Sequence, residues 1–355
     1  MKNVTGKLLN LLVTVVLTVM SVLGLGACSD TVSKSAYEYG QAIQYCNLVY
    51  ESITSDGKGY YCYYEENEPV IRGICNSFSY SGYENGTAVI EEYVGKDAYI
   101  DIPFKINGYY VFMLAKNCFD SKLWIKSVIV PDTVQIIDTY AFINCRLLDD
   151  VVLSENLKVL KGGFRNCNSL ESIELPDSLR YIESAFNGCS GLKEIKLPKE
   201  LKEISGSMFS GCRNLLGIEF LCEEAKIQTT SFFENCVKIE SANLPEGTEW
   251  IGESCYYGCK NLTEIILPST IEQIRDLAFA ECNRLIAVNI PDGVTSIGRF
   301  AFRNCKRLEN IYIPASVTRI DHGAFSGCNN LTITTEEGSF ADIAAKENGI
   351  PVKYR

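Results

Sequence analysis

The chain has 355 residues, of which 46% are hydrophobic and 22% are charged, which is the balance of a folded protein and excludes a disordered one. The formal net charge is −11, so the surface repels nucleic acid and anionic headgroups, and neither is an expected direct ligand. The single histidine, His322, falls at a variable turn position of the repeat described below. We therefore expect no Ser-His-Asp or Cys-His catalytic set.

Residues 1–27 have the layout of an export signal. Lys2 and Lys7 give a basic start, and the apolar run Leu8–Leu23 follows. The sequence Leu25-Gly26-Ala27-Cys28 then resembles a bacterial lipobox, in which the cysteine becomes the lipidated first residue. We expect an exported lipoprotein, anchored in the membrane at the cell surface through Cys28; ordinary secretory cleavage nearby is the alternative. Without Lys2 and Lys7, 31 positive residues face 44 negative ones, a net charge of −13.

A short polar tether is expected at 28–35, and a tyrosine-rich segment without repeat phase follows at 36–85. In this segment 36–52 is a possible helix, and 59–64 with 70–75 is a possible hairpin. Because a solenoid needs a cover over its first hydrophobic layer, we interpret the segment as a cap, and a separate binding role stays open. A disulfide among Cys46, Cys62 and Cys75 also stays open.

A repeat of 22–24 residues dominates the chain over 86–338. Its β-branched start, Gly86–Phe104, predicts strands that lead into the array. Ten aligned units are registered on one aromatic position. An internal period of this length indicates a solenoid. The aromatic column is Phe119, Phe142, Phe164, Phe186, Phe209, Phe233, Tyr256, Phe279, Phe302 and Phe325.

A cysteine stands three residues after each aromatic from Phe142 onward. Free cysteine behaves as a small, readily buried hydrophobe, so one per coil at a fixed position predicts a reduced packing ladder. Parallel side chains about 5 Å apart also do not reach the Cβ separation of about 3.8 Å that a disulfide needs. Cys118 and Cys255, in the small-residue slot before the aromatic, fit the same interpretation. The ladder is Cys145, Cys167, Cys189, Cys212, Cys236, Cys259, Cys282, Cys305 and Cys328.

The consensus Leu-x-x-Ile-x-Leu-Pro predicts one strand per coil. In Leu192–Pro198, Ile195 and Leu197 alternate with polar residues, so one face is buried and the other is wet. Neighbouring coils would add strands to a parallel sheet about 4.8 Å apart. Proline ends most strands, whereas Ser154 and Leu221 stand in two proline slots. The gap of 24 residues from Phe209 to Phe233 predicts a bulge or kink there.

The wet column of this sheet is the candidate binding face. Apolar members near both ends, together with Ile286, suggest adhesive patches; coverage by caps is the alternative. The column is Ile129, Val152, Glu174, Lys196, Glu219, Asn243, Ile266, Asn289 and Tyr312.

Residues 339–355 predict a C-terminal cap. Phe340–Asn348 has a helical pattern, with Ser339 as N-cap and Gly349 at the C′ position.

The sequence contains no Cys-x-x-Cys pair and no phosphate-binding glycine loop. We therefore expect no metal, no cofactor and no enzyme activity, although two acids alone could serve a hydrolase.

The repeat Leu-x-x-Ile-x-Leu-Pro-x-x-Leu-x-x-Ile-x-x-x-Ala-Phe-x-x-Cys resembles the leucine-rich repeats of BspA-like bacterial surface proteins, called type 5. The units centred on Phe279, Phe302 and Phe325 carry it best. The resemblance implies a right-handed solenoid of about ten units with a parallel sheet face, capped at both ends. It also implies a surface or secreted protein, in some members similar to adhesins, and not usually an enzyme.

Three functions remain open. The leading hypothesis is a lipid-anchored surface protein that recognises a host or envelope protein through the column. The second is an envelope scaffold without a specific ligand, and the third is a carboxylate hydrolase.

Overall fold

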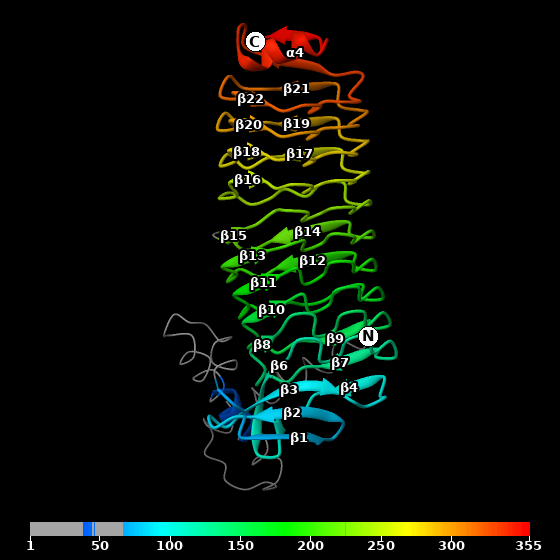
Figure 1. Ribbon diagram of the computed structural model, residues 1–355, viewed down its shortest axis with the longest axis vertical. Coiled ribbons are helices and arrows are strands. Elements are labelled where there is room, and N and C mark those ends of the chain that lie inside the picture. The colour runs from blue at the N-terminus through cyan, green and yellow to red at the C-terminus, as the bar shows by residue number, and fades with distance from the viewer. Residues whose placement is uncertain (1–37, 45, 47–66, 224) are drawn as a thin grey trace, which may run out of the picture.

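The computed structural model describes residues 38–44, 46, 67–223 and 225–355 (Figure 1). The expected signal peptide and tether, including Cys28, lie outside the described residues, as do Cys62 and the first half of the expected hairpin. Among the described residues, no helix is both long and apolar enough to cross a membrane.

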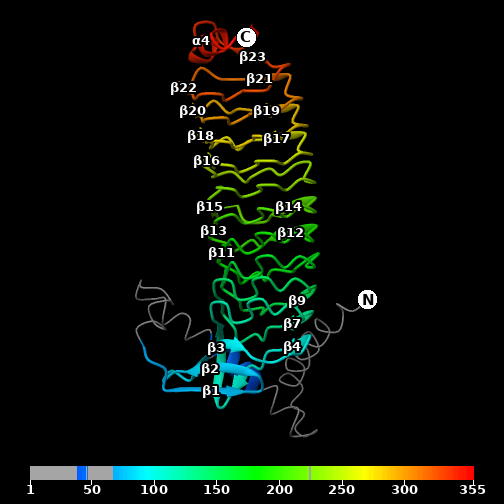
Figure 2. The ribbon, with the colours of Figure 1, turned by 45° about the vertical axis from the view of Figure 1, so that its right-hand side comes forward.

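The chain folds as a solenoid whose coils stack along one axis, with short strands on two opposite sides (Figures 1 and 2). The side built from Leu-x-x-Ile-x-Leu-Pro is the strand face. Its strands pair in parallel in three sheets. They are β4 (Tyr99–Asp101), β7 (Ser127–Ile129) and β9 (Asp150–Val152); β12 (Glu194–Leu197) and β14 (Gly217–Phe220); and β17 (Glu264–Ile266), β19 (Ala287–Asn289), β21 (Asn310–Tyr312), β23 (Thr332–Thr335) and β24 (Val352–Tyr354).

A second stack of strands, here called the return face, lies on the other side of the coils. The sequence predicted a sheet on one side only. Each coil turns inward again, as at buried Ile204, while its neighbour Glu203 points outward, so the period of two forms strands here too. The strands are β1 (Ile71–Cys75), β2 (Phe78–Gly82), β3 (Thr87–Tyr93), β5 (Lys105–Ile106), β6 (Tyr109–Leu114), β8 (Ile136–Ile137), β10 (Val159–Lys161), β11 (Tyr181–Glu183), β13 (Glu203–Ser205) and β15 (Lys226–Ile227), then β16 (Trp250–Ile251), β18 (Gln273–Ile274), β20 (Ser296–Ile297) and β22 (Arg319–Ile320).

The aromatic column fills the centre of the coils. Successive rings from Phe119 to Phe325 stack with centroids 4.6–6.0 Å apart and planes within 25° of parallel. Offset stacking of buried rings adds to the hydrophobic contribution of each ring. At the first end, Tyr93 stacks on Phe119 at 5.5 Å and Phe78 packs against both, so β2 and β3 extend the ladder.

The N-terminal segment contacts the array in two ways. β1, which matches the expected second half of a hairpin, pairs antiparallel with β2 through a turn at Asn76-Ser77, where both residues have positive φ. β2 in turn pairs antiparallel with β3, the first strand of the array. Residues 38–44 and 46 are helical. Glu38 accepts a hydrogen bond from Lys105 at 2.6 Å, and Cys46 lies buried among apolar residues of the return face.

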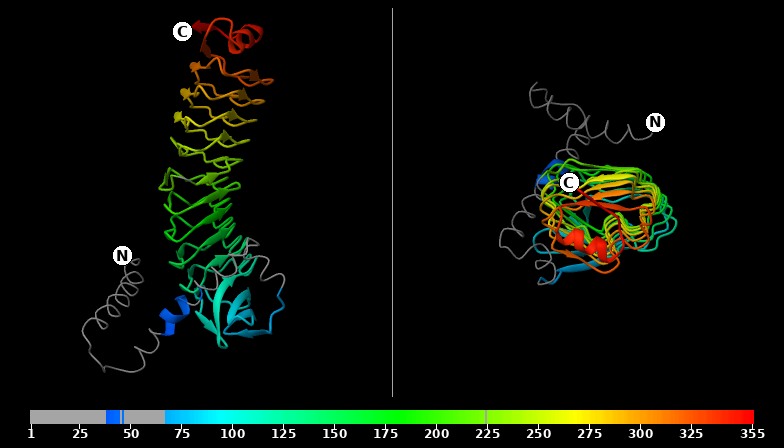
Figure 3. Two further views of the ribbon diagram at one scale, coloured as in Figure 1. Left: turned by 90° about the vertical axis from the view of Figure 1, so that its left-hand side faces the viewer. Right: turned by 90° about the horizontal axis from the view of Figure 1, so that it is seen from above.

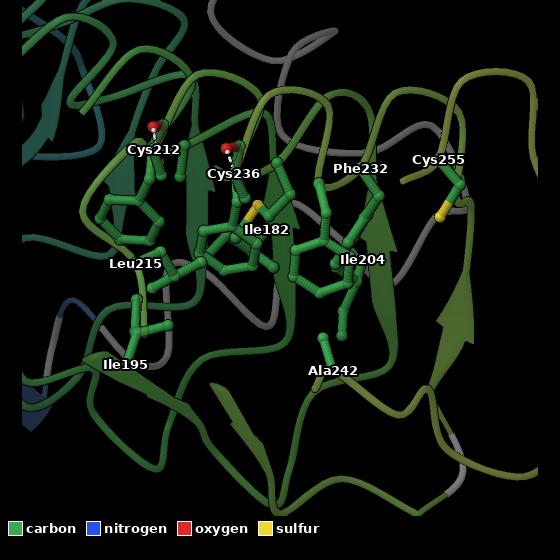
Figure 4. Packing of buried hydrophobic residues seen from close by; sticks show 14 of the residues in the cluster. Ile182, Ile195, Ile204, Cys212, Leu215, Phe232, Cys236, Ala242 and Cys255 are labelled. Atoms are coloured by element: carbon green, nitrogen blue, oxygen red, sulfur yellow. Dashed lines mark hydrogen bonds between the residues drawn. The ribbon is translucent and has the colours of Figure 1, made fainter. Parts of the chain in front are cut away.

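The repeat is irregular where the sequence predicted a kink. The first return-face sheet ends at β15 and the second begins at β16. Between them, buried Thr229 Oγ1 donates to Trp250 O at 2.9 Å and accepts from Gly252 N at 2.7 Å, so a side chain replaces strand bonds. The extra residue places Phe232 edge-on against both Phe209 and Phe233 (Figure 4).

The C-terminal end carries helix α4 (Phe340–Glu347). Ser339 is its N-cap and accepts a hydrogen bond from Asp342 N at 3.2 Å. Asn348 is the C-cap, and Gly349 follows with φ +65°, as expected of a C′ glycine. β24 then pairs with β23, so the apolar finish of the chain is a strand.

Candidate recognition surface

The nine candidate residues share one side of the solenoid. The pairing register aligns Ile129 with Val152, Lys196 with Glu219, and Ile266 with Asn289 and then Tyr312. These residues point outward because their strand neighbours are core residues, as Ile195 and Leu197 are beside Lys196.

Glu174 and Asn243 are exposed but lie in coils without a strand on this face. Asn243 Oδ1 instead accepts a hydrogen bond from Ile266 N at 3.1 Å, in place of a backbone carbonyl. The column therefore continues through the coil of Asn243. There a side-chain hydrogen bond to the next coil takes the place of the backbone hydrogen bonds that join the strands.

The middle of the strand face is charged. Lys196 Nζ lies 2.7 Å from Glu219 Oε2 and Lys193 Nζ lies 2.7 Å from Glu171 Oε2, each pair joining adjacent coils. The hydrogen bond to Glu219 raises the pKa of Lys196. Exposed pairs of this kind contribute little to stability, so they chiefly keep the middle of the face solvated.

An apolar group, here called the proximal patch, lies nearest the N-terminal end of the face. Ile129 and Val152 are 44% and 41% exposed, so the caps leave them accessible. Trp124 and Leu147 are also exposed, and both stand five residues after their ladder aromatic, one coil apart. The repeat register places both at one turn position, which strand alternation alone does not indicate. The patch comprises Tyr99, Leu123, Trp124, Ile129, Leu147 and Val152.

The apolar residues near the other end differ in accessibility. Ile266 is 66% exposed and Ile286 is also exposed. Tyr312, in contrast, is half-buried: its hydroxyl donates to Glu336 Oε1 at 2.9 Å, and the Arg355 guanidinium lies 4.8 Å from its ring centre. Burial and the bond to Glu336 raise the pKa of Tyr312. Tyr312 therefore belongs to the column and also contacts Glu336 and Arg355 near the C-terminus.

The ladder cysteines are free and buried, and each thiol is a hydrogen-bond donor. Each Sγ donates to the carbonyl oxygen of the aromatic one coil earlier, at 2.9–3.2 Å. Two of these bonds are drawn in Figure 4. Burial raises the pKa of Cys145 and of Cys189 to about 12, so these thiols are neutral and poor nucleophiles or ligands.

The other described cysteines, Cys46, Cys75, Cys118, Cys222 and Cys255, are also free. In the part of the chain that the structure describes, no group of three or more His, Cys, Asp or Glu side chains could hold a metal ion.

Comparison with known proteins agrees with this geometry. The family described as BspA type leucine rich repeat region matches residues 113–234 and 225–346, more than half of the chain. A search among curated proteins found no match.

Solved structures give weaker likenesses. A leucine-rich cell surface protein from Faecalibacterium prausnitzii is 23% identical, with 78% of this chain and 97% of that chain covered and a TM-score of 0.46. A leucine-rich repeat protein of T. pallidum is 26% identical, with 61% and 91% covered and a TM-score of 0.45. One from Bacteroides ovatus is 21% identical, with 80% and 99% covered and a TM-score of 0.33. On the family match, which spans most of the stacked coils, the chain belongs to the BspA-type leucine-rich repeat family.

Proposed function

We propose that the protein recognises a protein ligand at the cell surface through its strand face. The supporting observation is the proximal patch: Ile129 and Val152 are accessible on the strand face, and Trp124 and Leu147 are accessible in the turns that precede their strands, whereas the middle of the face is charged. Exposed apolar groups of this kind with polar surroundings are typical of protein-binding sites. Aromatic residues such as Trp124 are also frequent energetic centres of interfaces.

Photo-crosslinking on intact cells tests this function. A photoreactive amino acid at 129 or 152 should give a discrete protein adduct, whereas the same probe at Ile343 should not. Ile343 is the matched control because it is an exposed isoleucine on α4, outside the strand face. Equal adducts from all three positions, or none from 129 and 152, would contradict recognition by this face.

The recovered partner then allows a quantitative test. Ile129→Ser with Val152→Ser should weaken its binding at least about tenfold, as loss of interface centres does, while Ile343→Ser should leave it unchanged. A scaffold without a specific ligand predicts no partner and no phenotype in either variant. Charge reversal of both Lys196 and Glu219 also distinguishes the two hypotheses. Recognition through the strand face predicts weaker ligand binding in this variant, whereas a scaffold predicts an unchanged cell phenotype.

The export and anchoring of the chain are a separate part of the proposal. The Leu25–Cys28 sequence supports acylation of Cys28, and each buried methylene of an acyl chain adds about 0.8 kcal/mol to membrane binding. Cys28→Ser should move the protein from the detergent phase to the aqueous phase in Triton X-114 partitioning. Mass spectrometry that finds an unmodified mature N-terminus away from Cys28 would exclude the anchor.

A further inference from the structure

The aromatic ladder is least buried at its C-terminal end. Phe119 to Phe302 are 0% exposed at every ladder position, whereas Phe325 is 8% exposed. The thiols follow the same pattern: Cys305 is 0% exposed and Cys328 is 8% exposed. Phe325 stacks on Phe302 at 5.4 Å, and among the described residues no ring stacks on its other side.

A cavity of about 570 Å³ lies at this end, between the last coil and α4. Viewed along the axis, α4 crosses one side of the end of the solenoid (Figure 3). The floor of the cavity includes Phe325, Cys328 and Leu331. On the helix side Ala344 and Ala345 line it, and because both are small they leave space above the floor.

Polar groups line the same cavity. His322, Asn329 and Asn348 are exposed and belong to its lining. An apolar floor with a few polar groups, in a volume of about 300–1,000 Å³, is the usual form of a small-molecule site. The histidine and asparagine side chains could orient a ligand by hydrogen bonds to one edge.

We propose that this end cavity binds a small planar aromatic molecule of one or two fused rings, which stacks on Phe325 and continues the ladder. Shape determines this ligand class. The ladder repeats at about 5 Å with parallel planes, and Phe325, on which no further described ring stacks, belongs to the lining of the cavity. An aliphatic ring of equal volume would fill the space without the stacking that favours aromatic pairs.

The rate at which the Cys328 thiol is modified can report ligand binding, because Cys328 lines the cavity. Indole is the probe, and the modification of Cys328 by N-ethylmaleimide is followed in the folded full chain by peptide mass spectrometry. We expect saturating indole to slow modification at least threefold, and cyclohexanol at the same concentration to have less than half of that effect. No protection by indole, or equal protection by cyclohexanol, overturns the proposal.

Two variants and a control locate the effect. Ala344→Phe places a ring in the cavity and should slow modification of Cys328 and remove the protection by indole. Ile343→Phe adds a ring at the exposed neighbouring position of α4 and should change neither. Phe325→Leu keeps an apolar floor but removes the stacking surface, so it should weaken protection by indole at least threefold. Unchanged protection in Phe325→Leu would contradict stacking, even if Ala344→Phe failed to fold.

Discussion

The Sγ atom of Cys236 donates a hydrogen bond to the carbonyl oxygen of Phe209, 3.1 Å away in the preceding coil. The same oxygen accepts the backbone N–H of Cys212 at 2.9 Å, so the thiol occupies its second acceptor position. Because the bond recurs in each coil from Cys145 to Cys328, the cysteine column links adjacent turns on the side that has no sheet. This explains why cysteine, and not alanine alone, suits the position.

Removal of one thiol tests the contribution of this bond. Cys236→Ala should lower the free energy of unfolding by about 1–2 kcal/mol, from the lost bond and the small cavity. Cys118→Ala is the matched control: it removes the same atom from an equally buried site, where the thiol lies 4.0 Å from its acceptor Ala141 O, and alanine already fills that slot at Ala278 and Ala301. It should cost only a few tenths of a kcal/mol. Equal losses in urea denaturation would show that the bond contributes nothing.

Alkaline pH should unfold the solenoid through the same thiols. Burial raises the pKa of Cys189 from its ordinary value of 9.0 to about 12 in the folded state. The unfolded chain therefore releases its proton first. Stability is fully present below about pH 9 and falls as the pH rises from 9 toward 12, by up to about 1.4 kcal/mol per pH unit for each such thiol.

Thermal unfolding from pH 7 to 11 measures this dependence. The melting temperature should be level below pH 9 and fall steeply above it. Cys189→Ala should start lower and fall less steeply, because it has one titrating thiol fewer. An unchanged slope in this variant would exclude Cys189 as a contributor.

The periodic columns made the solenoid predictable from the sequence. One aromatic, one cysteine and one Ile-x-Leu pair per coil are local signals, and each places a side chain inward whatever the distant residues are. The position of the irregular coil was predictable too, because the gap of 24 residues from Phe209 to Phe233 is the longest in the array. The outward column followed from strand alternation alone.

Other features were not predictable because they depend on contacts outside the period. Tyr39 accepts a hydrogen bond from Asp132 N at 2.8 Å, across 93 residues, and nothing in the spacing indicates this pair. Trp124 and Leu147 of the proximal patch stand at a turn position outside the strand, so strand alternation does not predict them. The second sheet was not predictable because a return-face strand such as β18 has a single buried residue, Ile274, and so shows no repeated alternation.

Thr229 offers a third prediction, at the irregular coil. Its buried hydroxyl satisfies both Trp250 O and Gly252 N. Thr229→Val keeps the shape but leaves these groups without that partner, so we expect a loss of about 2–4 kcal/mol in the free energy of unfolding. Thr270→Val is the control, because Thr270 Oγ1 makes the same kind of double contact, with Thr248 O and Gly247 N, at an exposed position. Water can replace the hydroxyl there, and a loss as large as that of Thr229→Val would show that burial does not matter.

Glu281 provides a prediction of increased stability. The residue before each ladder cysteine has positive φ, and Asn or Gly usually holds it, as Asn304 does at +59° and Gly258 at +71°. Glu281 has φ +65°, a conformation that is costly for a side chain without local hydrogen bonding. Glu281→Asn should therefore raise the free energy of unfolding by about 0.5–1 kcal/mol.

The replacement should also preserve the lateral contact at this position. Asn304 Nδ2 donates to Glu281 Oε1 at 2.7 Å, and the same contact exists between two asparagines, where Asn166 Nδ2 donates to Asn144 Oδ1 at 2.9 Å. Glu272→Asn removes an equal charge at an exposed position of ordinary φ, so it controls for the net charge. If both variants shift the urea midpoint equally, charge explains the gain; only a gain confined to Glu281→Asn supports relief of backbone strain.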